Sequence, residues 1–167
     1  RSVLEIARQD DEVIVVDQNE PPLLDQNIGL ELLVVDRRLW VYHHAPPNLP
    51  AARNVAVRHA SCDLALFIDD DVALPSYFLN EHRRMYLAAG VASVGGAWLN
   101  VGTADERLAR QAIVENIAIE LGLDLRGRLT GRNFSIKRDI YKQLGGFDEA
   151  FVGPANYEDS DFAERVQ

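Results

Sequence analysis

The sequence lacks several features that would place it in a specialised class of proteins. It has a single cysteine, Cys62, among 167 residues, which excludes an internal disulfide and a zinc site built from cysteines. Its 17 lysines and arginines stand against 26 aspartates and glutamates, for a net charge of −9. This excess of negative charge disfavours bulk binding to nucleic acid or to an anionic membrane. No apolar run approaches the ~20 residues that span a bilayer, no signal peptide is visible, and a reducing, cytoplasmic compartment fits best.

The hydrophobic residues, 47% of the chain, follow strand and helix patterns in alternation. This alternation predicts one α/β domain with helices on the faces of its sheet, and the β-branched run at 12–17 predicts a strand buried on both faces of a parallel sheet. Strands are predicted at 12–17, 39–44, 64–68 and 91–94, and helices at 1–8, 49–60, 75–89, 107–121, 137–144 and from 158 onward. The pattern at 23–35 suits a helix or a strand, and 129–136 suits a turn or a strand.

Aspartates follow two of the predicted strands, where an open α/β sheet binds its ligands. Asp17 ends the first, and Asp69, Asp70 and Asp71 end the strand at 64–68. Because side chains alternate along an extended chain, Asp69 and Asp71 lie on one side, where their oxygens suit Mg²⁺ or Mn²⁺. The alternative is an acidic turn that caps the following helix and faces water.

A second acidic cluster opens the last predicted helix and has two interpretations. Glu158, Asp159 and Asp161 lie in its first turn, where the helix dipole favours carboxylates, so they could simply cap the helix. Alternatively, one of them is a general base that accepts a proton from an attacking hydroxyl. The residues alone leave both interpretations open.

Three segments resemble, in their order and spacing, parts of glycosyltransferase family 2, whose members are inverting enzymes with the GT-A fold. The segments are VIVVDQN, NLPAARNVAVRHASCDLALFIDDDVALP and GRNFSIKRDIYKQLGGFDEAFVGPANYEDSDFAERV, about half of the chain together. The resemblance implies a GT-A type, Rossmann-like α/β/α sandwich with a mostly parallel sheet. It also implies that residues 1–167 form a single catalytic domain that is incomplete at both ends, because the family's first strand would precede Arg1.

The same resemblance implies roles for the strand-end aspartates. Asp17 matches the residue that contacts the nucleobase. Asp69 and Asp71 match the outer members of the DxD motif, which contacts the ribose and the metal bound to the diphosphate. The implied cofactor-binding set therefore includes Asp17, Asp69 and Asp70, and the implied metal ligands are Asp69 and Asp71.

Further roles follow for residues elsewhere in the matching segments. Asp159 matches the catalytic base, and Gly131 and Asn133 match the loop that lines the donor sugar. Arg53 matches the arginine of the family's Ala-Arg-Asn segment, where it could contact the ligand, pack, or pair with a strand-end aspartate. Many relatives carry a histidine metal ligand after the Glu-Asp pair, whereas all four histidines here precede it.

The implied activity is metal-dependent, inverting transfer of a sugar from a nucleotide-diphosphate donor to a hydroxyl group, as in polysaccharide biosynthesis. The cation would be Mn²⁺ or Mg²⁺, and the acceptor a glycan, a lipid or another hydroxyl compound. No nucleic-acid partner is expected, and contact with the cytoplasmic membrane face through segments outside this chain stays open. One alternative is a non-catalytic or degenerate domain that binds a nucleotide sugar. Another is a haloacid-dehalogenase-type phosphohydrolase with Asp69 as nucleophile, although that motif fails at Ala73.

Overall fold

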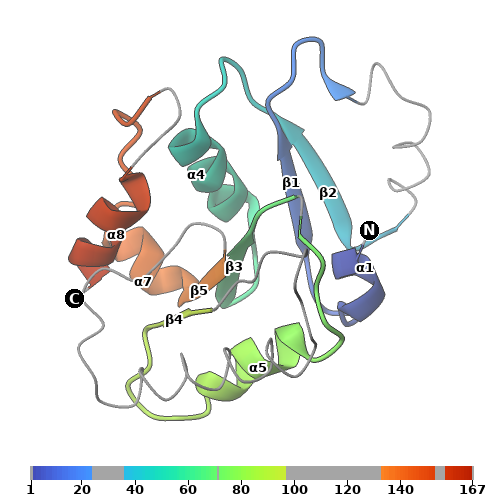
Figure 1. The fold of residues 1–167 in the computed structure, drawn as a ribbon, viewed down its shortest axis with the longest axis vertical. Helices are drawn as coiled ribbons and strands as arrows, with labels where there is room; N and C mark the ends of the chain where they lie inside the picture. The colour runs from blue at the N-terminus through green and yellow to red at the C-terminus, as the bar shows by residue number, and fades with distance from the viewer. Residues whose placement is uncertain (1, 24–35, 71, 97–132, 153–156, 167) are drawn as a thin grey trace, which may run out of the picture.

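The structure is a computed structural model that describes residues 2–23, 36–70, 72–96, 133–152 and 157–166. In chain order these ranges contain α1 (Ser2–Ile6), β1 (Val13–Asp17), β2 (Leu39–His43), α4 (Leu49–His59), β3 (Leu64–Ile68), α5 (Phe78–Met85), β4 (Ser93–Gly95), β5 (Asn133–Lys137), α7 (Arg138–Gln143) and α8 (Glu158–Val166), as Figure 1 shows. The predicted helix at 107–121 and nearly all of the undecided segment at 23–35 lie outside the described residues.

The strands pair in two groups that differ in direction. β1 and β2 are parallel, with Val13 opposite Leu39 and Asp17 opposite His43. β5 lies between β3 and β4 and is antiparallel to both. The prediction of a mostly parallel sheet is therefore confirmed for β1 and β2 only. The expected burial of β1 on both faces is wrong at Val15, a residue that is 44% exposed.

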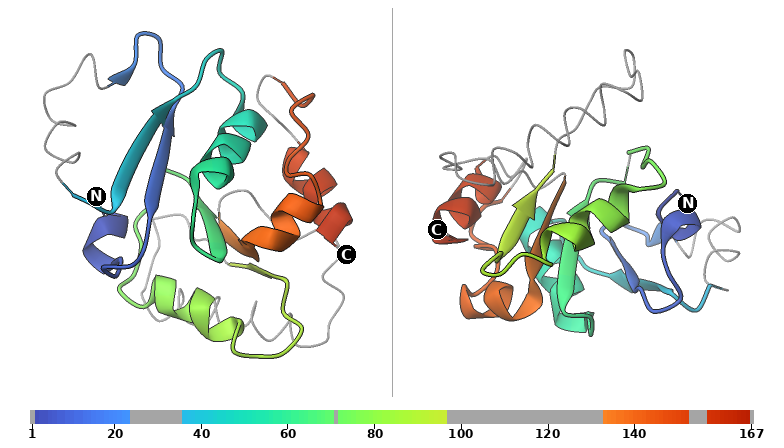
Figure 2. Two further views of the ribbon diagram at one scale, coloured as in Figure 1. Left: turned by 180° about the vertical axis from the view of Figure 1, so that it is seen from behind. Right: turned by 90° about the horizontal axis from the view of Figure 1, so that it is seen from below.

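Side-chain alternation along β5 divides the helices between the two faces of its sheet. Phe134 and Ile136 point into a core formed with residues of α7 and α8, and both are fully buried. Ser135 points to the other face, where its hydroxyl hydrogen-bonds to His82 of α5. Figures 1 and 2 accordingly show α5 apart from α7 and α8, with β5 between them.

Aromatic rings dominate the core beneath α7 and α8. The ring of Phe67 in β3 stacks on that of Phe134 in β5, with centroids 4.7 Å apart, and Phe147 stacks on Phe162 of α8 at 4.6 Å. Burying each of these phenylalanines stabilises the folded protein by about 1.5–3 kcal/mol. This shared core fastens α8, and the acidic cluster that begins it, to the sheet.

The predicted helix at 49–60 is confirmed, whereas the helix predicted at 75–89 is shorter. The Asn48 side chain caps α4 by accepting a hydrogen bond from the Ala51 N–H at 2.9 Å, and proline occupies the first turn, where its missing N–H costs little. α5 begins only at Phe78 and ends at Met85, after which Tyr86 and the next residues bond three positions back. These tight turns end the helix before residue 89, where its end was predicted.

Candidate functional site

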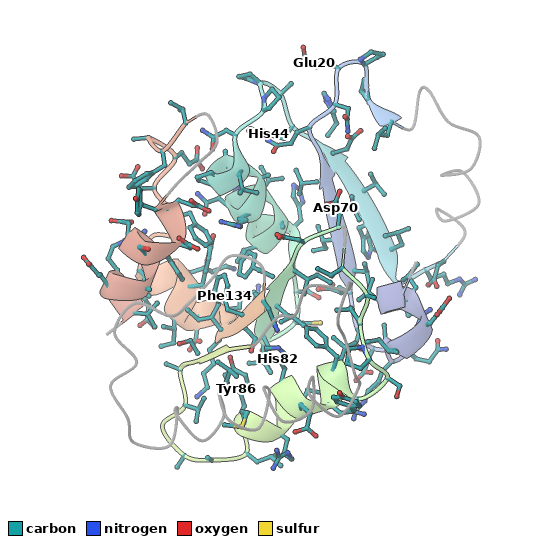
Figure 3. The ribbon with its side chains drawn as sticks, in the orientation of Figure 1. Glu20, His44, Asp70, His82, Tyr86 and Phe134 are labelled. Atoms are coloured by element: carbon teal, nitrogen blue, oxygen red, sulfur yellow. The ribbon has the colours of Figure 1, made fainter. Side chains whose placement is uncertain are left out.

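Asp69 and Asp70 follow β3 directly, and the strand register places Asn133 next to them. Ile68 pairs with Asn133, so the first residue of β5 lies at the edge where β3 presents Asp69. Asp69 is half-buried, and Asp70, which Figure 3 labels after β3, is exposed. Asp71, predicted for this edge, and Gly131, predicted for the loop that lines the donor sugar, lie outside the described residues.

The carboxylates at this edge have the chemistry that a hard divalent cation requires, because Mg²⁺ and Mn²⁺ prefer oxygen ligands. Within the part of the chain that the structure describes, no group of three or more histidine, cysteine, aspartate or glutamate side chains is arranged to hold a metal ion. The carboxylate oxygens are therefore suitable ligands for the predicted cation. The ligand pair of Asp69 and Asp71 stays a prediction, because only Asp69 is described.

Asp17 is buried at the end of β1, where its carboxylate organises the loop that follows. One oxygen accepts hydrogen bonds from the backbone and side-chain nitrogens of Asn19 at 3.0 and 2.5 Å, and the other accepts from the Leu23 N–H at 2.6 Å. Burial by itself raises the pKa of Asp17, but these hydrogen bonds outweigh it and lower the pKa below its ordinary value. Asp17 therefore stays charged, and its predicted contact with a nucleobase stays a prediction.

Arg53 forms a buried ion pair with Glu158, the first residue of α8. Its Nη1 lies 2.8 Å from the carboxylate, and the two side chains are only 9% and 6% exposed. The guanidinium also lies over the Phe147 ring, 4.8 Å from its centroid. Of the roles considered from the sequence, the structure shows pairing with a carboxylate. The partner is Glu158 at the start of α8, whereas the pairing considered from the sequence was with a strand-end aspartate.

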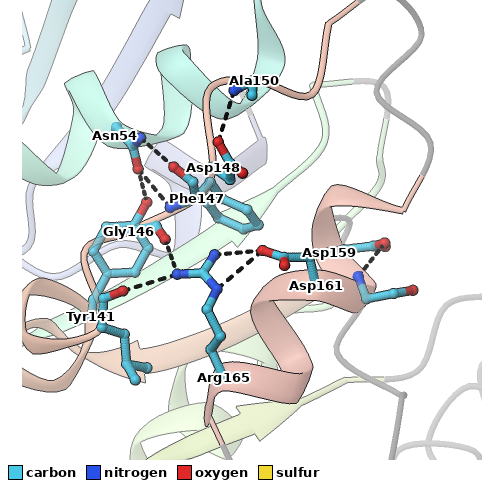
Figure 4. Close-up of polar contacts among 11 residues, drawn as sticks. Asn54, Tyr141, Gly146, Phe147, Asp148, Ala150, Asp159, Asp161 and Arg165 are labelled. Carbon is cyan, nitrogen blue, oxygen red and sulfur yellow. Dashed lines mark hydrogen bonds and ion pairs between the residues drawn. The ribbon is translucent and has the colours of Figure 1, made fainter.

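Asp161 is also engaged by an arginine (Figure 4). Nε and Nη2 of Arg165 donate to the Asp161 carboxylate at 3.0 and 2.8 Å. Nη1 donates to the carbonyl oxygens of Leu144 and Gly146 at 2.9 and 2.7 Å. Asp161 and Arg165 therefore tie α8 to the turn that follows α7.

Asp159 lies between the two acidic residues that pair with arginines. It is half-buried at the second position of α8, and its carboxylate accepts a hydrogen bond from the Ser160 N–H at 2.8 Å. This contact belongs to the first helical turn, where backbone N–H groups favour an anion. The residue before the cluster, Tyr157, has a φ of 79° and is 75% exposed, so the chain enters α8 through a left-handed turn.

Asn54 is a central residue of this region that the sequence interpretation did not single out. Its side-chain oxygen accepts hydrogen bonds from the Tyr141 hydroxyl at 2.5 Å and the Phe147 N–H at 2.9 Å. Its amide nitrogen donates to the Phe147 carbonyl oxygen and to Glu149, both at 2.9 Å. The sequence contained one signal for this role: asparagine is a poor helix former, yet Asn54 lies inside a predicted helix.

His82 is a second residue that was not predicted, and it contacts the predicted Asn133. Its Nε2 lies 2.9 Å from the side-chain oxygen of Asn133, and both residues are buried. The available signal was its position on the apolar face of α5, together with Phe78, Leu79 and Met85.

The helices that the structure describes are all too short or too polar to cross a membrane.

Comparisons with known proteins identify the family. The family model described as Glycosyl transferase family 2 matches residues 1–147. No curated protein matches the sequence. The solved structure of the mannosyltransferase PcManGT from Pyrobaculum calidifontis, in complex with GDP-Man and Mn²⁺, aligns with a TM-score of 0.60 and 19% identity over 93% of this chain and 42% of that one. The structure of S. aureus TarS 1-349 aligns with a TM-score of 0.65 and 15% identity, over 96% of this chain and 47% of that one.

The two structural likenesses confirm the predicted α/β fold of the GT-A type, and the chain spans less than half of either structure. The family match ends at Phe147, so it includes the strand-end aspartates, Arg53 and Asn133 and stops short of Asp159. It covers most of this chain, in agreement with the resemblance of the three sequence segments. The chain belongs to glycosyl transferase family 2.

Proposed function

We propose that this chain carries the catalytic site of a glycosyltransferase that moves a sugar from a nucleotide-diphosphate donor to an acceptor hydroxyl with inversion. The family match over residues 1–147 carries this proposal. The complex of the similar mannosyltransferase with GDP-Man and Mn²⁺ supports a nucleotide sugar and a divalent cation here. A glycan or lipid acceptor, a role in polysaccharide biosynthesis and a cytoplasmic location belong to the same proposal.

The donor would bind at the carboxyl ends of β1 and β3. Asp17 would contact the nucleobase, Asp69 and Asp70 the nucleotide, and Gly131 and Asn133 the sugar. A divalent cation held by Asp69 and Asp71 would act as a Lewis acid that stabilises the departing diphosphate. Such a cation also explains how a chain with a net charge of −9 can hold a diphosphate.

Asp159 would act as the general base of a single displacement. Its carboxylate takes the proton from the acceptor hydroxyl, whose oxygen forms a bond to the anomeric carbon of the sugar. The bond from that carbon to the diphosphate breaks, and its electron pair leaves with the nucleoside diphosphate. The ion pair of Arg53 with Glu158 supports this role, because it holds the first turn of α8 in place.

Two other interpretations are weaker. The phosphohydrolase motif requires its aspartate after the first strand of its domain, whereas Asp69 follows β3, and membership of glycosyl transferase family 2 argues against it. The second is a domain that binds a nucleotide sugar without turning it over, and the experiments below distinguish it from an active enzyme.

Calorimetry of UDP and GDP binding, with and without Mn²⁺, tests the donor site. We expect one nucleotide to bind with Mn²⁺ and to bind at least about tenfold more weakly without it, because the diphosphate then meets uncompensated carboxylates. Asp69→Asn should remove this metal dependence, whereas Asp139→Asn, an exposed change on α7, should keep it. Binding that is equally tight without the cation would contradict the assignment of Asp69.

Asp159→Asn tests the general base. We expect release of nucleoside diphosphate from the donor to fall by about 10²–10⁴-fold, while metal-dependent nucleotide binding is kept. Asp148→Asn is a matched control, because Asp148 is exposed and its carboxylate bonds to the Ala150 N–H two residues on. Equal loss of binding and turnover would make Asp159 a structural residue. Nucleotide binding without turnover in the wild-type protein would favour the non-catalytic domain.

A further inference from the structure

Tyr157 directly precedes α8, in a position and a backbone conformation that are both unusual for tyrosine. Its carbonyl oxygen accepts a hydrogen bond from the Asp161 N–H at 3.0 Å, which makes it the N-cap residue of the helix. N-cap residues are usually serine, threonine, aspartate or asparagine, whose short side chains accept hydrogen bonds from the first turn. The φ of Tyr157 is 79°, a left-handed value that glycine and asparagine adopt far more readily than a bulky residue does.

Packing does not explain this tyrosine either. Tyr157 is 75% exposed, and within the described part of the chain its hydroxyl makes no hydrogen bond and no other ring stacks on it. Backbone preference, helix capping and burial would therefore all be satisfied at least as well by another residue. Such a conflict between a residue and its local structure indicates a functional role. What tyrosine adds at this position is a flat aromatic face that is open to solvent.

Tyr157 is held near the proposed general base. Tyr157 and Asp159 are two residues apart, so their Cα atoms are separated by at most about 7 Å. Glu158, the residue between them, is fixed by its buried ion pair with Arg53, in which the two charged atoms are 2.8 Å apart. This pair holds the backbone from which both side chains extend, and a single sugar ring can span the distance between them.

The surroundings of Tyr157 indicate what kind of molecule its ring contacts. One face of a sugar ring carries C–H groups, which stack on the electron-rich face of an aromatic ring, and its hydroxyls donate hydrogen bonds to oxygen acceptors. Asp159 and Ser160, both half-buried, supply such acceptors. The polar residues at 158–161 interrupt the continuous apolar surface that a lipid chain would need, and the net charge of −9 disfavours an anionic acceptor. These features together fit a neutral sugar.

We propose that Tyr157 is an acceptor-binding residue: its ring stacks on a sugar ring of the acceptor and holds a hydroxyl of that sugar next to Asp159, so that the acceptor is a neutral saccharide. This inference rests on the proposed function, which assigns Asp159 as the general base for an acceptor that is either a glycan or a lipid. The contact is made to the acceptor alone, whereas the donor is assigned to the ends of β1 and β3.

Two substitutions of Tyr157 separate the role of its ring from its effect on the fold. Tyr157→Asn removes the ring and introduces a residue that adopts a left-handed φ and caps helices, so the melting temperature should stay the same or rise. Tyr157→Phe keeps the ring and removes only the hydroxyl. Leu87→Asn, which removes an apolar side chain from a residue that is 85% exposed, is the control.

Release of nucleoside diphosphate from GDP-mannose or UDP-glucose is measured with Mn²⁺ and increasing amounts of an acceptor probe. The saccharide probes are methyl glucoside, methyl mannoside and methyl N-acetylglucosaminide, and glycerol and octanol are hydroxyl compounds without a sugar ring. For the saccharide that accelerates release, we expect Tyr157→Asn to raise KM about five- to tenfold, as for the loss of one stacked aromatic contact. Tyr157→Phe and Leu87→Asn should stay within about twofold of the wild-type KM. The Kd of the donor, measured by calorimetry, should stay within about twofold in every variant.

An unchanged KM in Tyr157→Asn, or equal increases in Tyr157→Asn and Tyr157→Phe, would overturn the stacking contact while leaving the proposed function intact. Acceleration by glycerol or octanol alone would do the same, since it would show an acceptor without a sugar ring. So would acceleration by none of the probes, because one sugar ring suffices for the contact. A melting temperature of Tyr157→Asn below that of the wild type would make Tyr157 a structural residue. A wild-type protein that binds neither donor with Mn²⁺ would overturn the proposed function and this inference with it.

Discussion

Arg53 and Glu158 are separated by 105 residues in the chain, and they meet as a buried ion pair. Removing charges from water costs several kcal/mol per ion, and only a close partner offsets that cost. The stacking of Arg53 on Phe147 further fills the space around the guanidinium. At the scale of single residues, this pair fixes the position of the turn that carries Asp159.

Glu158→Gln tests the pair at constant size. We expect the free energy of unfolding, measured in urea, to fall by about 3–5 kcal/mol, because the Arg53 charge is left buried without its partner. Glu81→Gln is the control, since Glu81 pairs with Arg84 at the surface, where side chains are 30% and 57% exposed, and its loss should be ~1 kcal/mol or less. Losses of similar size in the two variants would show that the Arg53 pair contributes no more than a surface pair.

The turn that follows α7 is packed closely against a side chain of α4. Gly145 and Gly146 have φ values of 81° and 74°, which side chains rarely adopt. Gly145 would have open space for a Cβ atom, whereas a Cβ atom at Gly146 would clash with the side-chain oxygen of Asn54. The helix α4 and this turn are therefore fitted to each other at Gly146.

The two glycines provide a matched pair of substitutions. Gly145→Ala should lower the free energy of unfolding by about 1–2 kcal/mol, the cost of a left-handed alanine. Gly146→Ala should cost at least about 1 kcal/mol more, because Asn54 must then give up a buried hydrogen bond to the Tyr141 hydroxyl or the Phe147 N–H. Urea denaturation of both variants measures the difference. Equal losses would mean that the turn shifts without disturbing Asn54.

The response of the whole molecule to pH combines one histidine with several carboxylates. Burial lowers the pKa of His82 below its ordinary value of 6.5. The unfolded chain therefore takes up a proton on this residue at pH values where the folded protein does not. Burial raises the pKa of Asp11 and of Asp17, but hydrogen bonds from Arg83 to Asp11 and from Asn19 to Asp17 outweigh it and lower both below 3.8. Their contribution to stability is therefore present above that value and lost below it.

We expect the free energy of unfolding of the wild-type protein to decrease as the pH falls below 6.5, with a slope of at most ~1.4 kcal/mol per pH unit from His82. A second decrease should follow below 3.8, when Asp11 and Asp17 of the unfolded chain become protonated. In His82→Gln the first decrease should disappear and the second should stay. Urea denaturation between about pH 7.5 and about pH 3 measures both. An unchanged first decrease in the variant would assign it to another group.

Much of the fold could be predicted because its signals are local. The strands β1, β2 and β3 and the helix α4 were predicted within one or two residues, since their periods and caps lie within each segment. The shortening of α5 was not predicted, because tight turns after Met85 replace a helical pattern that continues in the sequence. Asp17 and Asp69 were placed at strand ends by the same local patterns, whereas Asn133 was singled out by the family resemblance, and the structure brings the ends of β3 and β5 to one edge.

The sequence by itself determined the alternation of strands and helices, the acidic strand ends and the acidic start of α8, because periodicity and charge are properties of neighbouring residues. Only the tertiary structure decided that β5 runs antiparallel to both neighbours, that Arg53 pairs with Glu158, and that His82 hydrogen-bonds to Asn133. The two side-chain contacts join residues that are 105 and 51 positions apart. Packing and the need to pair buried polar groups select these contacts, and neither can be predicted from neighbouring residues in the sequence.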